Sequence, residues 1–119
     1  MSWWISLCDE NGYVTVPNHN EGGTVNLNGG EDDAAMSVTS NYSQLISEST
    51  KLSDLRGFHG MSGKKAAPIL ATAVAYLSII NHGKVSTDYW EATPGNVAKC
   101  LKILLDWALQ HPVAEFNVN

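Results

Sequence analysis

Charged side chains are scarce in this sequence, at 16% of its 119 residues, whereas globular proteins usually have about 25%. Seven residues are basic and twelve are acidic, which gives a net charge of −5. A protein that binds nucleic acid polymers needs a basic face, so this composition argues against that class. Neutral polar residues replace the missing charges, and because weakly charged surfaces favour association, we expect a homo-oligomer.

Long apolar runs are missing as well. The most apolar stretch, Ala66 to Ile80, is interrupted by polar residues and Pro68, and it is too short to cross a bilayer. The N-terminal sequence MSWW has neither the basic nor the apolar region of a signal peptide. We therefore expect a cytoplasmic protein without a membrane segment, in which Cys8 and Cys100 are reduced thiols.

Histidines and cysteines are too scattered to predict a metal site or a catalytic site. None of the histidines is spaced from another His, Cys or carboxylate as zinc ligands are. No Gly-x-Ser-x-Gly motif is present, and Cys100 lies beside an apolar stripe, where a thiol is inert. We expect no metal, no cofactor, no catalytic residue and no enzymatic activity. The histidines are His19, His59, His82 and His111.

The N-terminal half of the sequence contains short segments that favour β-structure. Residues 3–7 and 13–16 flank Asp9-Glu10-Asn11-Gly12, and Asn-Gly is a strong signal for a hairpin turn. Residues 24–27 and 34–39 alternate in polarity and predict two further strands.

Further along the chain, residues 41–46 predict a short helix that Ser40 or Asn41 caps. Residues 48–63 are rich in glycine and predict mostly loop. Residues 115–118 alternate again and predict a last strand, which we expect to pair with the N-terminal one.

Two long helices are predicted in the C-terminal half. The first covers about residues 64–81, with Ser62 as its N-cap and Gly83 in a left-handed conformation after its end. The second begins with Thr93 as N-cap and Pro94 as its first residue, and it ends near His111. Strands followed by helices predict one α+β domain over residues 1–119. In it, a small antiparallel sheet of about four to five strands packs against two C-terminal helices.

The glycine-rich segment from Arg56 to Lys65 is the first candidate binding site. It contains three of the seven basic residues and leads into the first long helix. Free N–H groups and the dipole at a helix start favour a phosphate or a carboxylate. The glycine spacing differs from that of a Walker A loop, and the alternative is a capped helix with two solvated lysines. The candidate ligand-binding residues are Arg56, Ser62 and Lys64.

The start of the second long helix is another candidate. Its two preceding aromatic residues would stack a base while the helix N–H groups bind the phosphate. The alternative is a hydrophobic staple, in which Tyr89 or Trp90 packs over the first turn. Asn41 and Tyr42 form a third polar and aromatic pair at an element boundary, with a similar alternative. The candidate residues of the second helix are Tyr89, Trp90, Thr93 and Asn96.

The order of several motifs resembles a family of small uncharacterised phage and prophage proteins. The resemblance covers nearly the whole chain and implies a phage accessory protein, but it implies no particular activity. This chain has Ser78 followed by Ile79-Ile80 where the family tends to have a glycine after Leu77, which affects the end of the first long helix. The motifs are W-x-I-x-L at 3–7, EGGT at 21–24, VTxNYS at 38–43, DYWxxTPGN at 88–96 and WAxxHP at 107–112.

Small acidic phage proteins without catalytic groups look like antagonists of host defence, and two mechanisms suit this sequence. In the first, an oligomer in the host cytoplasm sequesters a small anionic, nucleotide-like ligand at the helix N-termini. In the second, the chain binds and inhibits a host defence protein, as anti-CRISPR proteins do. A role as a virion or morphogenesis accessory is a third hypothesis.

Overall fold

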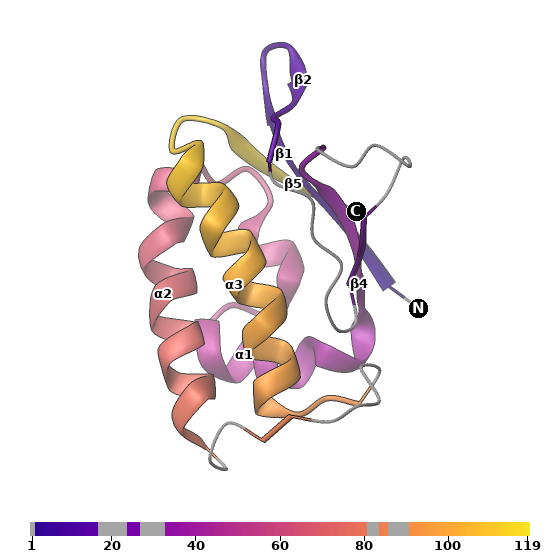
Figure 1. The fold of residues 1–119 in the computed structure, drawn as a ribbon, viewed down its shortest axis with the longest axis vertical. Coiled ribbons are helices and arrows are strands. Elements are labelled where there is room, and N and C mark those ends of the chain that lie inside the picture. Colours follow the sequence, from indigo (N-terminus) through magenta and orange to yellow (C-terminus); the bar gives the residue numbers. More distant parts are fainter. Residues whose placement is uncertain (1, 17–23, 27–32, 81–83, 86–90) are drawn as a thin grey trace.

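The computed structural model describes residues 2–16, 24–26, 33–80, 84–85 and 91–119. The expected left-handed Gly83 therefore lies outside the described residues. The elements form one antiparallel sheet with helices on one of its faces (Figure 1). This arrangement confirms the predicted α+β class, with strands in the N-terminal half and two long helices after them.

The first strand, β1 (Ser2–Asp9), lies in the interior of the sheet. Both β4 (Ala35–Thr39) and β5 (Glu115–Val118) pair with Ile5, so they lie on opposite edges of β1. The short strand β3 (Thr24–Asn26) pairs with β4. The pairing of β5 with β1 confirms the contact between the two ends of the chain that the alternation predicts.

The N-terminal hairpin is also confirmed. β2 (Gly12–Tyr13) pairs with the end of β1, and Gly12 has a φ of +105°, which glycine adopts without steric cost. The backbone N–H of Asn11 donates to the carboxylate of Asp9 at 2.8 Å. β2 is shorter than the predicted segment. Beyond Tyr13, the N–H of Val14 still donates to the carbonyl of Leu7 at 3.0 Å, and Thr15 forms an isolated bridge with Asp33.

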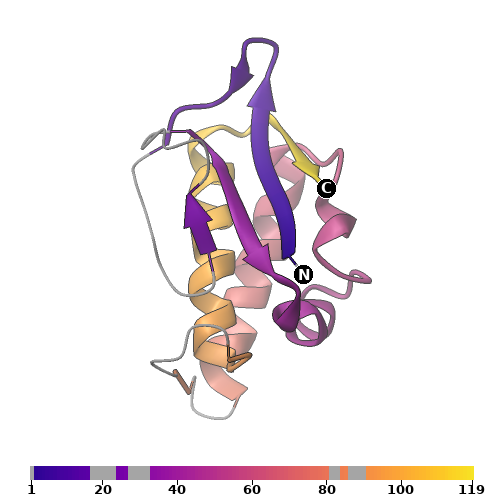
Figure 2. The same cartoon turned by 90° about the vertical axis from the view of Figure 1, so that its right-hand side faces the viewer.

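The two long helices are α2 (Gly63–Ile79) and α3 (Pro94–Gln110). They run antiparallel, side by side, on one face of the sheet (Figures 1 and 2). Both predicted caps are confirmed. The hydroxyl oxygen of Ser62 accepts the N–H of Lys65 at 3.1 Å, and that of Thr93 accepts the N–H of Asn96 at 3.3 Å.

The segment between the sheet and α2 is more helical than predicted. A 3-10 helix, η1 (Ser40–Tyr42), leads into α1 (Ser43–Thr50), and a second one, η2 (Leu55–Phe58), interrupts the predicted loop. The cap also lies one residue earlier than expected, since Thr39 accepts the N–H of Asn41 at 3.3 Å. The loop prediction is wrong at η2 because Leu55 and Phe58 are fully buried, and tertiary packing overrides the glycine signal.

The core fills the space between the sheet and the helices. Buried side chains of α2 and α3 face it, and the rings of Phe58 and Phe116 lie 6.2 Å apart within it. The helical spacing also predicts Tyr76 on the core side of α2, but this prediction is wrong, since Tyr76 is 40% exposed. The largest fully buried side chains include Trp107, Tyr42, Phe58, Phe116, Ile5 and Leu7.

Candidate functional site

The backbone N–H groups at the start of α2 already have acceptors within the protein. The N–H of Gly63 donates to the carbonyl of Ala114, and the N–H of Lys64 donates to the carbonyl of Pro112, both at 2.8 Å. The next N–H, that of Lys65, donates to the Ser62 cap. An anion at a helix start binds through these donors, so the loop that leads into β5 occupies the position that a ligand would need.

Arg56 is engaged with Asp54. Its Nη2 lies 2.6 Å from Oδ2 of Asp54, and its Nε donates to both carboxylate oxygens at 3.1 and 3.2 Å. The same carboxylate accepts the backbone N–H of Arg56 at 2.8 Å and so caps η2. The side-chain hydrogen bonds from Arg56 hold the pKa of Asp54 below its ordinary value, and Asp54 raises the pKa of Arg56. The two residues therefore stabilise a local turn.

The second candidate site, at the start of α3, is closed in a similar way. The N–H of Gly95 donates to the carbonyl of Lys84 at 2.7 Å, and the preceding residue is a proline without an N–H. The side-chain amide of Asn96 donates to the carbonyl of Glu91 at 3.0 Å, while its backbone N–H is held by Thr93. Thr93 and Asn96 are both buried. Tyr89 and Trp90 lie outside the described residues.

The two residues of the third candidate pair, Asn41 and Tyr42, lie in different environments. Asn41 is exposed, and its backbone N–H is bound by the Thr39 hydroxyl. Tyr42 is fully buried, so its ring packs in the core and has no face on which a ligand would stack.

The candidate sites do not combine into one site. Because α2 and α3 are antiparallel, their N-termini lie at opposite ends of the helical layer (Figure 1). Each helix has 17 residues, and at a rise of about 1.5 Å per residue their starts lie about 25 Å apart. Arg56, Ser62 and Lys64 belong to the segment beside β5, since η2 contacts β5 and Ser62 forms a bridge with Glu115.

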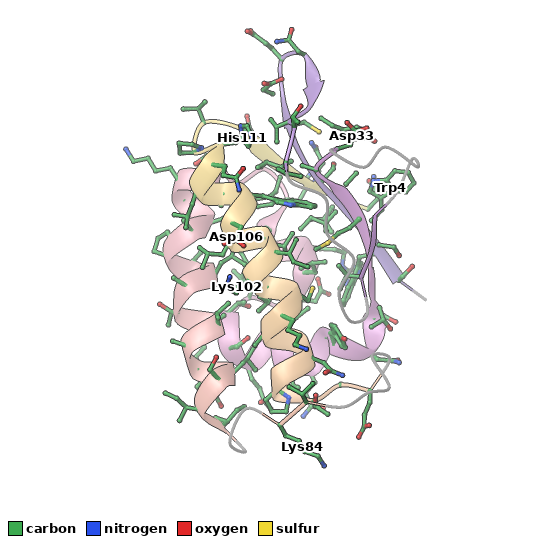
Figure 3. The ribbon with its side chains drawn as sticks, viewed as in Figure 1. Trp4, Asp33, Lys84, Lys102, Asp106 and His111 are labelled. Carbon is green, nitrogen blue, oxygen red and sulfur yellow. The ribbon has the colours of Figure 1, made fainter. Side chains whose placement is uncertain are left out.

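The sheet face that points away from the helices is a surface that the sequence reasoning missed. Side chains alternate along a strand, so Trp4 (Figure 3) and Cys8 point outward while the buried Ile5 points toward the helices. Tyr13 pairs with Cys8 and shares its side of the sheet. The only sequence signal was the polarity alternation in β1 itself. We call this surface the outer sheet face and define it by Trp4, Ser6, Cys8, Tyr13, Ala35, Ser37, Glu115 and Asn117.

Two partly exposed aromatic side chains mark the ends of the outer sheet face. The exposed fraction is 39% for Trp4 and 41% for Tyr13. Cys8, the strand partner of Tyr13, is four residues from Trp4, which corresponds to about 13 Å along the strand. Between them lies a cross-strand row in which Asn117 is exposed, whereas Ala35 and Ser6 are buried.

An acidic hollow of about 720 Å³ adjoins the outer sheet face at its hairpin end. Three carboxylates line it, and the described lining residues include no Lys or Arg. A hollow of this charge suits a cationic group and repels a phosphate. The lining residues are Cys8, Asp9, Glu10, Val113, Glu115 and Asn117.

The described part of the chain holds no group of three or more His, Cys, Asp or Glu residues that could bind a metal ion. Both cysteines are free, as predicted. Burial raises the pKa of the Cys100 thiol to about 12, so this thiol is neutral at physiological pH. Nδ1 of His59 accepts the N–H of Val118 at 3.0 Å, and Nε2 of His111 lies 2.7 Å from the carbonyl oxygen of Thr15. These two histidines hold backbone segments in place.

Comparison of the chain with family models, with curated proteins and with solved structures finds no match in any of the three. The resemblance to phage proteins remains an expectation from the sequence. Among the helices that the structure describes, none combines the length and the apolar character needed to span a membrane.

Proposed function

We propose that this chain is a non-enzymatic binding protein and that its partner is another protein, which docks on the outer sheet face. The observation that carries this proposal is the partial exposure of two aromatic residues, Trp4 and Tyr13, on the sheet face that points away from the described helices (Figure 2). Tyrosine and tryptophan are enriched among the residues that dominate the energy of protein interfaces. Because Ser6 and Ala35 between them are buried, the partner contacts this face mainly through the two aromatic residues.

The acidic hollow indicates the charge of the partner. A Lys or Arg side chain of the partner fits beside Asp9, Glu10 and Glu115, where opposite charges fix the orientation of the complex. The net charge of −5 accelerates association with a basic surface. The partner is therefore a protein with a basic side chain next to an apolar patch.

The geometry favours a protein partner over the sequestration of a small anionic ligand. At both helix starts, the N–H groups that an anion would bind already have acceptors in the protein. Because the hollow beside the sheet is lined by carboxylates, it disfavours an anion as well.

We also propose, from the resemblance to phage proteins, where the chain acts. In that setting the chain is a phage accessory protein in the cytoplasm of the host cell, and its partner is a host defence protein that it inhibits. A virion or morphogenesis accessory would use the same face with a phage protein as its partner. We also propose that the chain is a homo-oligomer that leaves this face accessible.

Affinity capture from a host lysate tests the outer sheet face. The wild-type chain, a Trp4→Ala/Tyr13→Ala variant and a Leu109→Ala control are compared after circular dichroism shows that each is folded. Leu109 is 63% exposed on α3, so the control removes a similar apolar group from another surface. We expect the wild type and the control to capture a common protein that the double variant loses at least tenfold. Equal capture by the double variant would refute this role of the face.

A second measurement separates the two mechanisms. Calorimetry of the wild-type chain against cyclic nucleotides and ADP-ribose derivatives should give no binding heat. If one of them binds tightly and the double variant still binds it, the protein-partner proposal is wrong and the sequestration mechanism is favoured.

A further inference from the structure

The exposed face of α2 carries no charge over most of its length. The sequence from Ala66 to Ile80 contains no charged residue, although many of its side chains are exposed and Ile79 is 75% exposed. On α3, by contrast, the exposed residues include Lys102 and Asp106, which pair at 3.6 Å (Figure 3). A solvent-facing helix without charge favours association.

The exposed residues of α2 form one continuous stripe. Pro68, Thr72, Ala75 and Ile79 follow one another at intervals of three and four residues, which places them on one side of the helix, and all four are exposed. α2 contacts α3 and α1 on its other sides, and it lies at the edge of the molecule (Figure 1). We call this stripe the α2 face.

The charges at the two ends of α2 indicate what covers the α2 face. Lys64 and Lys65 lie in its first turn, which has no acidic residue, and its last turn has no basic residue. The helix dipole favours negative charge at the N-terminus and positive charge at the C-terminus, so the two lysines oppose it and the last turn lacks the positive charge that it favours. A second α2 in antiparallel orientation corrects both, because the lysines of each copy then lie beside the carbonyl end of the other.

We propose that the chain forms a two-fold symmetric homodimer in which the α2 face packs antiparallel against the α2 face of a second copy, with Thr72 near the symmetry axis. In such an interface the same patch is used by both subunits. With Thr72 at the axis, Pro68 lies opposite residue 76 of the second copy, and Lys64 lies opposite its residue 80.

A groove beside the axis supplies a place for an anchoring side chain. It lies between α1 and α2 and has a volume of about 310 Å³. In the proposed dimer, Tyr76 of the second copy lies on the groove side of α2 and level with Pro68, so its ring enters this groove. Tyr76 is 40% exposed in the single chain. The groove is lined by Ser49, Thr50, Lys51, Pro68, Ile69 and Thr72.

Molar mass in solution tests the dimer directly. One helix pair with one groove on each side gives an interface at the lower end of the stable range, so we expect a dissociation constant on the order of 10 µM. Analytical ultracentrifugation from about 1 to about 100 µM should show the mass rising from 12.9 kDa toward twice that value. A constant mass of one chain over this range would overturn the proposal.

Charge variants at the axis locate the interface. Thr72→Glu and Thr72→Arg each place two like charges together, and because Thr72 is exposed and both replacements are good helix formers, the fold should be retained. Each variant alone should dimerise at least tenfold more weakly than the wild type. An equimolar mixture should recover the dimer through the Glu–Arg pair.

The matched control is Leu109→Glu, which adds the same charge to an exposed apolar position of α3 and should leave dimerisation unchanged. A dimer that Leu109→Glu weakens and Thr72→Glu does not would show that another face is used. These outcomes are independent of capture by the outer sheet face, so the dimer and the proposed function can fail separately.

Discussion

Gly63, the first residue of α2, lies directly against the backbone of Ala108 near the end of α3. A Cβ atom at Gly63 would lie 2.8 Å from the carbonyl oxygen of Ala108 and 2.6 Å from that of His111. Real Cβ atoms do not approach backbone oxygen so closely, so the start of one helix and the end of the other touch only because residue 63 has no side chain.

Gly63→Ala should therefore destabilise the protein by about 1–3 kcal/mol, the usual cost of overpacking. The added methyl group would push α2 away from α3 and stretch the hydrogen bond from Gly63 to Ala114. Urea denaturation monitored by tryptophan fluorescence measures the change. Lys64→Ala, at the neighbouring exposed position, should change the free energy of unfolding by less than about 0.5 kcal/mol. Equal stability of Gly63→Ala and the wild type would contradict the close approach.

Asp54 should make the free energy of unfolding depend on pH in the acidic range. Because hydrogen bonds from Arg56 lower the pKa of Asp54 in the folded chain, the unfolded chain binds a proton more readily, and the stabilisation is present above the unfolded pKa of about 4. It is lost as the pH falls through the lower, folded pKa. The stability difference between the wild type and Asp54→Asn should be constant from pH 7 to about pH 5 and should shrink below about pH 4.

An Arg56→Gln background provides the control for this pH dependence, because it removes the main cause of the lowered pKa. In the Arg56→Gln variant, the change that Asp54→Asn causes in the free energy of unfolding should vary less with pH. With Arg56 present, the stability difference between the wild type and Asp54→Asn should shrink at low pH. If this difference stays constant down to about pH 2.5, Asp54 is not stabilised in its charged form.

Lys51→Gly should stabilise the protein. Lys51 ends α1 with a φ of +65°, a left-handed conformation that is strained for a residue with a Cβ atom. Glycine relieves this strain, with an expected gain of about 0.5–1 kcal/mol in the free energy of unfolding. Lys51→Ala removes the same charge but keeps the Cβ atom, so it should show no gain. A loss of stability in Lys51→Gly would indicate that the lysine side chain itself stabilises this end of α1.

The two cysteines should differ in reactivity toward a thiol reagent. Cys100 is fully buried with a pKa of about 12, whereas Cys8 is partly exposed on the outer sheet face. The labelling rate of Cys100 in the folded protein should therefore be at least a hundredfold below that of a free thiol, since burial reduces both its thiolate fraction and the access of the reagent. Titration should give one reactive thiol per folded chain and two after denaturation, and Cys8→Ser should abolish the fast reaction. Rapid labelling of Cys100 in that variant would mean that the helical layer opens readily.

The elements whose stabilising contacts are local could be predicted from the sequence. The caps at Ser62 and Thr93 and the turn at Gly12 depend on atoms within about four residues, and each lies where it was predicted. The sheet and the core stripes follow from periodicity, which also depends on neighbouring positions.

The surroundings of the candidate sites depend on distant contacts, which a local sequence pattern does not predict. The sequence showed helix starts rich in binding groups but could not show that the carbonyls of Pro112 and Ala114, about fifty residues away along the chain, reach the start of α2. It also could not show that α2 and α3 run antiparallel and so separate the two starts.

By itself, then, the sequence determined the α+β class, the hairpin, both helix caps and the low charge of the surface, because these follow from composition and short-range hydrogen bonds. Only the tertiary structure decided which polar and aromatic groups remain available at the surface. It gave the N–H groups at both helix starts acceptors within the protein, and it left Trp4 and Tyr13 partly exposed on the sheet face that points away from the helices. Availability depends on packing between segments far apart in the chain, which no local pattern encodes.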